Sequence, residues 1–235
     1  MNKIICADCM EILPTLKSGS IDLVITDPPY DIKNVQTGNN SEFSRSFQKM
    51  NDEIKSENLT GGVSLDFCKE ILRLQNKVNA YIWCNKSQIL PYLKFFVEEN
   101  GCAFDILVWR KTNAVPTFNN KYLSDKEYCL YFRRGGYCNP PNYNQASTVF
   151  ETPINVEDKK KWKHPTIKPL GIIKTLVENS SKVGDTILDM FCGSGTTAIA
   201  SLALRRNYLC IEKSHKWAQI ANERIAEYNK QFTLF

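Results

Sequence analysis

The sequence contains no apolar run long enough to cross a membrane and no recognisable secretion signal. Its apolar runs stay far below the roughly 18 residues that a spanning helix requires. Residues 1–9 lack both a basic region and a long apolar stretch, so we expect no secretory signal peptide. Internal repeats and low-complexity tracts are also absent. At 235 residues the chain is long enough to form one large α/β domain with an ample core.

The nine cysteines do not have the spacing of a metal site or of a disulfide framework. Cys6 and Cys9 form a C-x-x-C pair, but no second pair at ligand spacing accompanies it. Most of the others stand in apolar runs. Buried free thiols in a reducing cytoplasm explain this distribution better than zinc or disulfides. We therefore expect no metal, no membrane partner and a cytoplasmic protein.

The net charge is only +5, but basic residues are concentrated in one part of the chain. Between Lys111 and Lys168, lysines and arginines alternate with aromatic residues. This mixture suits a surface that binds the phosphates of a nucleic acid and stacks on its bases. A solvated loop region with a small local core would give the same pattern. The candidate DNA-binding residues are Lys121, Arg133, Arg134, Lys159, Lys160 and Lys161.

Strand-like and helix-like segments alternate along most of the chain. Apolar, often β-branched runs predict strands at 2–6, 21–26, 78–84, 102–109, 127–133, 186–190 and 208–212. Helices are predicted at 8–16, 62–76, 87–99, 169–180, 196–204 and 215–228, the third of them capped by Ser87. This alternation predicts a mostly parallel, seven-stranded sheet with helices on both faces.

The alternation is interrupted once, which divides the predicted domain into three parts. Residues 1–110 form the catalytic half, and residues 164–235 form the cofactor-binding half. Residues 111–163, irregular from 139 onward, are the natural target-recognition insertion. Within the first part, residues 31–60 are polar and long for a connection, so we expect a mobile functional loop there.

A glycine loop follows the strand predicted at 186–190. Gly193 and Gly195 allow a sharp turn and the close approach of a ligand to the backbone. Small polar residues that can donate hydrogen bonds surround them: Ser194, Thr196 and Thr197. Glu212 ends the next strand, where it can accept hydrogen bonds from ribose hydroxyls or be a solvated charge. A dinucleotide loop would carry a third glycine where Ala198 stands, so a nucleoside cofactor is favoured over NAD.

The segment Asp27-Pro28-Pro29-Tyr30 follows the strand predicted at 21–26. The prolines fix the backbone and remove two N–H donors, which leaves the local carbonyls free to accept. Asp27 and the Pro28 carbonyl can accept both N–H groups of an exocyclic amine, and an extruded base can stack on Tyr30. The methyl transfer that this arrangement allows is direct and in-line, without a cysteine nucleophile. A simple proline turn after a strand would give the same four residues.

Together these motifs resemble the β group of DNA amino-methyltransferases, and the resemblance covers nearly the whole chain in order. Three more segments carry it: Cys6-Ala7-Asp8-Cys9, Val108-Trp109-Arg110-Lys111 and His164-Pro165-Thr166-Ile167-Lys168-Pro169. The resemblance implies a Rossmann-like class I methyltransferase fold that uses S-adenosylmethionine. It places Asp8 near the cofactor adenine, and Thr166 and Lys168 near the cofactor carboxylate. The cofactor-binding residues are then Asp8, Cys9, Asp27, Thr166, Lys168, Asp189, Phe191, Cys192, Gly193, Ser194, Gly195, Thr196, Thr197 and Glu212.

In that family the aspartate form of the catalytic motif is typical of enzymes that modify adenine N6. Asp27 therefore favours an adenine-N6 DNA methyltransferase, with Asp27, Pro28, Pro29 and Tyr30 as catalytic residues. The alternatives are a cytosine-N4 enzyme, an RNA amino-methyltransferase and an inactive protein that only binds the cofactor and nucleic acid. The resemblance also implies DNA as partner, a homodimer, and a cognate restriction endonuclease where the protein belongs to a restriction–modification system.

Overall fold

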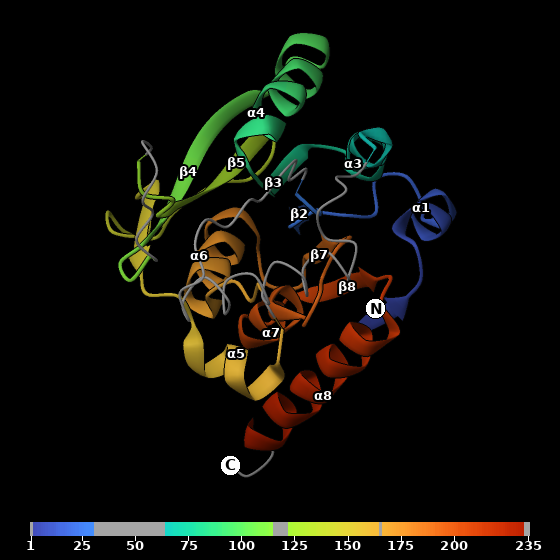
Figure 1. Cartoon of the computed structure of the whole chain (residues 1–235). Helices are drawn as coiled ribbons and strands as arrows, with labels where there is room; N and C mark the ends of the chain where they lie inside the picture. Colours follow the sequence, from blue (N-terminus) through green and yellow to red (C-terminus); the bar gives the residue numbers. More distant parts are fainter. Residues whose placement is uncertain (1, 31–63, 115–121, 165, 233–235) are drawn as a thin grey trace.

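The computed structural model of the chain describes residues 2–30, 64–114, 122–164 and 166–232 (Figure 1). The loop expected at 31–60 and the candidate DNA-binding residue Lys121 lie outside these ranges. Within them, eight strands form one sheet in the order β1-β8-β7-β2-β3-β5-β4-β6. β5 is antiparallel to both of its neighbours, and every other pairing is parallel. The sheet is mostly parallel, as predicted, but has eight described strands instead of seven.

The bounds of the elements follow the predicted alternation closely. The strands are β1 Lys3–Cys6, β2 Leu23–Thr26, β3 Val78–Cys84, β4 Ala103–Lys111, β5 Lys126–Arg134, β6 Val149–Thr152, β7 Thr186–Asp189 and β8 Asn207–Glu212. The helices are α1 Cys9–Ile12, the 3-10 turn η1 Leu13–Thr15, α3 Asp66–Leu74, α4 Lys86–Leu93, the π-helical η2 Lys94–Glu99, α5 Val156–Trp162, α6 Leu170–Ser180, α7 Thr196–Ala203 and α8 His215–Phe232.

The eighth strand, β6, and the helix α5 lie in a segment that the sequence predicts to be irregular. β6 pairs in parallel with the end of β4, from Val108 to Lys111. The side chain of Asn155 caps α5 by accepting a hydrogen bond from the Asp158 N–H at 3.1 Å. Both elements are short and stand among Pro and Asn residues, so neither produces a long periodic pattern in the sequence.

Helix α4 begins earlier than predicted, because Asn85 rather than Ser87 is its cap. The Asn85 side chain accepts hydrogen bonds from the N–H groups of Ser87 at 3.0 Å and Gln88 at 3.2 Å. The Gln88 side chain accepts one from the Asn85 N–H at 3.0 Å, which completes a capping box. Gln88 also donates to the Pro29 carbonyl at 3.1 Å. The cap of α4 thereby holds the loop that follows β2.

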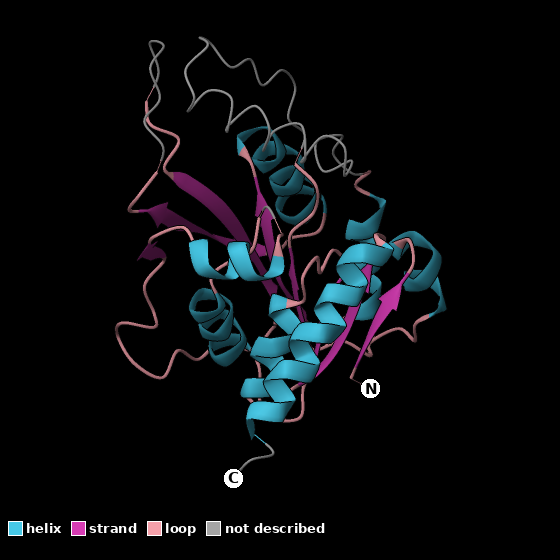
Figure 2. Cartoon of the chain, turned by 60° about the horizontal axis from the view of Figure 1, so that its bottom comes forward, coloured by secondary structure: helices cyan, strands magenta, loops and turns pink. Residues whose placement is uncertain are grey.

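Helices cover both faces of the sheet (Figures 1 and 2). On one face, side chains of α3, α4 and η2 such as Phe67, Tyr92 and Phe96 pack on the sheet. On the other face, α6 and α7 pack on Tyr81 and Trp83 of β3 and on their neighbours. Every residue of β3 is buried. β3 therefore lies in the middle of the core.

This strand order brings the predicted motifs to one edge of the sheet. β1, β8, β7, β2 and β3 are parallel neighbours, so their carboxyl ends share an edge. Asp27 follows β2, the glycine loop follows β7, and Glu212 ends β8. β5 runs in the opposite direction, so its first residues, including Glu127, reach the same edge.

The cysteines are free, as predicted, and all but two are buried; Cys6 is exposed and Cys138 is half-buried. Among the described residues, no group of His, Cys, Asp and Glu is arranged to hold a metal ion. None of the described helices combines the length and apolar character that crossing a bilayer requires.

Candidate active site

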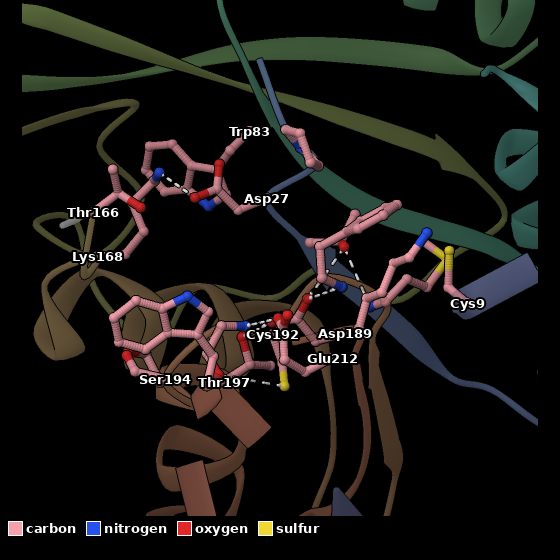
Figure 3. Close-up of a pocket in the computed structure, with 18 of the residues that line it drawn as sticks. Cys9, Asp27, Trp83, Thr166, Lys168, Asp189, Cys192, Ser194, Thr197 and Glu212 are labelled. Atoms are coloured by element: carbon pink, nitrogen blue, oxygen red, sulfur yellow. Dashed lines mark hydrogen bonds and ion pairs between the residues drawn. The ribbon is translucent and has the colours of Figure 1, made fainter. Parts of the chain in front are cut away.

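A cavity of about 730 Å³ lies at this edge, where β1, β8, β7 and β2 end (Figure 3). Every residue predicted to bind the cofactor lines it except Gly195. Asp27 and Pro29 of the catalytic segment line it, whereas Pro28 and Tyr30 do not. Sites for small molecules typically have volumes of ~300–1,000 Å³. The predicted cofactor residues and the predicted catalytic aspartate therefore share one site of suitable size.

The two loop glycines are required by geometry. Both have positive φ angles, +48° at Gly193 and +79° at Gly195, a region that other residues rarely adopt. A Cβ on Gly193 would lie 2.8 Å from Nε2 of His164. A Cβ on Gly195 would lie 2.9 Å from the Cβ of Ala221 in α8. Gly195 thus allows the close packing of α8, and Gly193 allows the loop to pass beside His164.

Glu212 holds the glycine loop in place. Its Oε2 accepts a hydrogen bond from the Gly193 N–H at 2.8 Å, and its Oε1 accepts one from the Ser214 N–H at 2.8 Å. A carboxylate oxygen can accept a second hydrogen bond, so the same side chain has the capacity to bind a diol. Glu212 lines the cavity and is therefore more than a solvated charge at a strand end.

Asp189 joins the two motif-bearing strands. Its Oδ1 accepts hydrogen bonds from the Thr26 hydroxyl at 3.1 Å and from the Phe191 N–H at 3.1 Å. Its Oδ2 accepts one from the Thr197 hydroxyl at 2.6 Å. Burial raises the pKa of Asp189 to about 7, while these hydrogen bonds act in the opposite direction. Asp189 therefore anchors β2, the glycine loop and α7 to one another.

The hydroxyls that the sequence suggests as donors to a ligand have partners within the protein. Besides the bond from Thr197 to Asp189, the Ser194 hydroxyl and carbonyl each accept a hydrogen bond from Arg224 at 2.7 Å. Arg224 also donates to the Thr196 hydroxyl at 3.3 Å. These side chains shape the loop, and the backbone beside them faces the cavity.

Asp27 belongs to a buried cluster of charges. Lys168 Nζ donates to Asp27 Oδ2 at 2.5 Å and lies 3.0 Å from Glu127 Oε2. Lys111 Nζ lies 2.6 Å from Glu127 Oε1. The Tyr30 hydroxyl lies 3.3 Å from Lys168 Nζ and 3.4 Å from Glu127 Oε2. The cluster therefore ties both ends of the catalytic segment to β4, to β5 and to the residues before α6.

Burial and neighbouring charges have opposite effects on the pKa values of the residues in this cluster. Burial raises the pKa of Asp27, and the positive charge of Lys168 opposes that rise. Burial alone would raise the pKa of Glu127, but Lys168 and Lys111 outweigh it and hold this pKa at about 2. Burial works against the charge of Lys168, yet Asp27 and Glu127 raise its pKa above the usual value. Glu127 and Lys168 are therefore charged at neutral pH.

One oxygen of this cluster has no partner within the described residues. Asp27 Oδ1 is buried and accepts no hydrogen bond, and the indole N–H of Trp83 is buried and unpaired as well. Trp83 and Asp27 both line the cavity, and Lys168 Nζ lies 5.1 Å from the centre of the Trp83 ring (Figure 3). Buried polar atoms are rarely left unpaired, so an open acceptor here indicates a ligand that donates hydrogen bonds.

Lys168, which the resemblance places near the cofactor carboxylate, lines the cavity. Its ammonium group contacts Asp27, Glu127 and Tyr30. Thr166 does line the cavity, and its N–H donates to His164 Nδ1 at 3.2 Å. Burial lowers the pKa of His164 to about 3, so this imidazole is neutral.

The structure separates the candidate DNA-binding residues. Arg133 and Arg134 lie at the end of β5 that pairs with Val78 and Asn79, about 20 Å along the strand from Glu127. Arg134 donates to the Asn100 carbonyl there. Both arginines therefore lie at the opposite edge of the sheet from the cavity, whereas the three lysines lie on α5.

The three lysines of α5 differ in their surroundings. Lys161 forms an ion pair with Glu227 of α8. Lys159 is half-buried, and burial together with the nearby charge of Lys111 lowers its pKa. Lys160 is exposed.

The candidates derived from sequence omit several residues of the site, among them Trp83, Glu127, His164 and Trp217. Glu127 stands in a strand whose direction cannot be inferred from its own residues. Trp83 lies near the end of a buried strand and is indistinguishable from other core residues by pattern. Trp217 lines the cavity from the first turn of α8 and packs edge-on against His164, with 4.3 Å between ring centres. An aromatic residue shortly after Glu212 is the only sequence signal for it.

Comparisons with known proteins agree with this geometry. A family model described as DNA methylase matches residues 21–223. The chain is 30% identical over 240 residues to the type II methyltransferase M2.LlaDCHI of Lactococcus lactis subsp. cremoris, covering 93% of this chain and 87% of that protein. It is 29% identical to the type II methyltransferase M.HinfI of Haemophilus influenzae, covering 97% of this chain and 69% of that protein.

Solved structures show the same fold. The crystal structure of the M1.HpyAVI–SAM complex matches with a TM-score of 0.68 and 27% identity, covering 95% of this chain and 100% of that one. The cytosine-N4-specific PvuII DNA methyltransferase matches with a TM-score of 0.65 and 15% identity, covering 98% of this chain and 92% of that one, which is a likeness of fold alone.

Proposed function

The chain belongs to the DNA methylase family, and on that premise we propose that it transfers a methyl group from S-adenosylmethionine to the N6 amino group of adenine in DNA. One observation carries the choice of chemistry. Asp27 lines the cavity beside the glycine loop, and its buried Oδ1 is an acceptor that has no partner among the described residues. An exocyclic amine is the donor that fits such an acceptor. The aspartate in this position favours adenine over cytosine.

The lining of the cavity fits S-adenosylmethionine. Glu212 has the acceptor capacity for ribose hydroxyls, and the loop lacks the third glycine that a pyrophosphate would favour. We propose Asp8 and Phe191 as the residues that contact the adenine of the cofactor. With Lys168 engaged in the charge cluster, Thr166 is the remaining candidate for the methionine carboxylate. When bound, S-adenosylmethionine supplies an electrophilic methyl group on a sulfonium sulfur.

The residues of the chain provide positioning and electrostatics for the transfer. Asp27 Oδ1 accepts one N–H of the target amine, and the Pro28 carbonyl is the proposed acceptor of the other. The Pro29 carbonyl already accepts from Gln88, which keeps the segment rigid. Holding both N–H groups favours a pyramidal nitrogen whose lone pair is directed at the methyl group. Methylation of the nitrogen would release one proton from the amine, and Asp27 is the adjacent base that would take it.

A direct assay tests this proposal. Purified protein is incubated with S-adenosylmethionine and unmethylated DNA, and the DNA is digested to nucleosides for mass spectrometry. We expect N6-methyldeoxyadenosine. N4-methyldeoxycytidine would move the assignment to the cytosine enzymes, and modification of RNA alone would reject DNA as substrate. Absence of any methylated nucleoside, with cofactor binding retained, would support an inactive binding protein.

The biological setting is part of the proposal. The similar proteins are named type II methyltransferases, which favours a restriction–modification system with a cognate endonuclease. A cytoplasmic location and a homodimer are proposed on the same basis. Light scattering of the purified protein measures the oligomeric state. We also propose target recognition by residues 111–163. β5 and β6 belong to the sheet, so the parts of that segment outside these two strands are the candidates.

Removing the charges of Lys159, Lys160 and Lys161 by substitution with glutamine is expected to weaken DNA binding. Each phosphate contact that is lost reduces the magnitude of the slope of log K against log[salt] by ~0.9. We therefore expect the magnitude of this slope to fall by about 1 to 3. Fluorescence anisotropy over a series of salt concentrations measures it. Substitution of Arg133 and Arg134 by glutamine is the matched control, because they lie at the opposite edge of the sheet. An unchanged slope in the lysine variant would show that α5 does not contact DNA.

A further inference from the structure

Glu127 is a half-buried carboxylate that takes no direct part in the transfer proposed above. Its side chain, 19% exposed, projects from the start of β5 at the edge of the sheet where the cavity lies. Its Oε1 pairs with Lys111 at 2.6 Å. Its Oε2 is shared by Lys168 at 3.0 Å and the Tyr30 hydroxyl at 3.4 Å. Glu127 therefore contacts residues on both sides of the charge cluster.

The contacts of Lys168 show what Glu127 contributes. An ammonium group has three N–H donors. Here three acceptors surround it: Asp27 Oδ2 at 2.5 Å, Glu127 Oε2 at 3.0 Å and the Tyr30 oxygen at 3.3 Å. With its donors directed at these atoms, Lys168 contacts one oxygen of Asp27, and Oδ1 has no partner in the part of the chain that the structure describes. Without Glu127, one donor would be free to turn toward Oδ1 and close the acceptor.

Stability alone does not account for this cluster. Desolvation of buried charges often costs as much as their attraction returns, so apolar residues of similar volume would serve a purely structural purpose as well. The cluster instead contacts the first and the last residue of the catalytic segment, Asp27 and Tyr30. The cluster contains two carboxylates and two ammonium ions, so its charges balance. Because it contacts both Asp27 and Tyr30, it can fix the orientation of these two residues.

We propose that Glu127 is a positioning residue for methyl transfer, which keeps Lys168 directed away from Asp27 Oδ1 and holds the Tyr30 hydroxyl. Asp27 thereby keeps one oxygen open for the target amine, and the tyrosine ring keeps the orientation in which a base stacks on it. This inference rests on the proposed function. It assigns a role to a residue that lies outside the catalytic segment and outside the cavity lining.

The inference has a pH signature that a purely structural role lacks. The titratable and charged groups around Asp27 are Tyr30, Cys84, Tyr92, Glu127, Cys129, Lys168 and Asp189, and Lys111 and Lys159 interact with Glu127. The negative charge of Glu127 raises the pKa of Asp27. Removing that charge therefore lowers the pKa of Asp27. Because Asp27 acts as a carboxylate, the acidic limb of the pH–rate profile should move to lower pH.

Two variants separate the geometry of Glu127 from its charge. Glu127→Ala removes both, and Glu127→Gln keeps an oxygen that can accept from Lys168. We expect Glu127→Ala to lower kcat by about a hundredfold, as small misplacements of reacting groups do. We expect Glu127→Gln to recover about a tenth of the wild-type kcat and to shift the acidic limb downward. The KM for DNA and the calorimetric Kd for S-adenosylmethionine should change less than about threefold, because the effect belongs to the transfer step.

Glu151→Gln is the matched control, because Glu151 pairs with Arg110 across β6 and β4 at 2.7 Å but is 52% exposed. It should leave kcat and the pH profile unchanged. A second readout is the carboxyl titration of Asp27 in the free protein, followed by 13C NMR. It should shift to lower pH in Glu127→Gln.

A kcat for Glu127→Ala within about twofold of wild type would overturn the inference. So would Glu127→Gln with an unmoved acidic limb and an unmoved Asp27 titration. Wild-type protein that transfers no methyl group would instead reject the proposed function. The NMR titration would still report in that case, because it needs neither cofactor nor DNA.

Discussion

Asp27→Asn is expected to lower kcat for methyl transfer by ~10³, in the range seen when one preorganised electrostatic contact at the reaction centre is lost. Asparagine keeps the shape of the side chain but loses its charge. Its amide oxygen would bind Lys168, which leaves the amide NH2 facing the target amine. Two donors would then meet where a donor and an acceptor are needed, and no carboxylate would be present to take the proton.

Two measurements on this variant separate catalysis from binding and folding. The Kd for S-adenosylmethionine, measured by calorimetry, should stay within about threefold of wild type, because the loss concerns an interaction made to the amine. Asp105→Asn is the control, since Asp105 is exposed on β4 and away from the cavity. If Asp27→Asn retained more than about a tenth of the wild-type kcat, Asp27 would not be the acceptor described here.

Lys168→Met is expected to lower the free energy of unfolding by ~3–5 kcal/mol at neutral pH and to abolish transfer, because it leaves Asp27 without its cationic partner and beside the like charge of Glu127, which keeps only Lys111. Lys168 is 7% exposed, so solvent cannot replace it. Urea unfolding followed by circular dichroism measures the change. Lys69→Met is the matched control, because Lys69 is 71% exposed in its ion pair with Asp66 and should contribute little.

This loss of stability should depend on pH in a defined direction. Without Lys168, the folded-state pKa of Asp27 rises further above the unfolded value of 3.8, which favours the protonated form. The resulting penalty is absent below that unfolded pKa and grows as pH rises through the folded-state pKa. Lys168 also holds the pKa of Glu127 at about 2, and that stabilisation is present above the unfolded value of 4.5.

Both effects make the loss of unfolding free energy in Lys168→Met larger at neutral pH than in acid. We therefore expect it to be smaller at about pH 4.5 than at about pH 8. An equal deficit at both values would show that the loss comes from packing of the lysine side chain and not from uncompensated charge.

The sequence predicts those parts of the site whose residues are neighbours along the chain. The glycine loop and the Asp27 segment each follow a buried strand directly, and residues placed there reach the ligand edge of a parallel sheet whatever the strand order is. The positive φ angles at positions 193 and 195, and the close approach of the His164 and Ala221 side chains, explain why glycine stands at both positions. The same logic places Glu212 at the end of β8.

The rest of the site depends on tertiary arrangement. Glu127 reaches Asp27 only because β5 runs antiparallel between β3 and β4, and nothing in its residues reveals that direction. The reversed direction also carries Arg133 and Arg134 away from the cavity, although their composition suggested a nucleic-acid surface. The ion pairs of Lys168 with Asp27 and Glu127 were not predicted either, because they join residues that are far apart in the sequence.

The most direct test is long-read sequencing of DNA from a methylation-deficient bacterial host that expresses either the wild-type chain or Asp27→Asn. We predict modified adenine within one short sequence motif in the wild-type sample and none in the variant sample, with equal amounts of both proteins present. Modified cytosine, or adenine modification that persists in Asp27→Asn, would contradict an adenine-N6 transfer centred on Asp27.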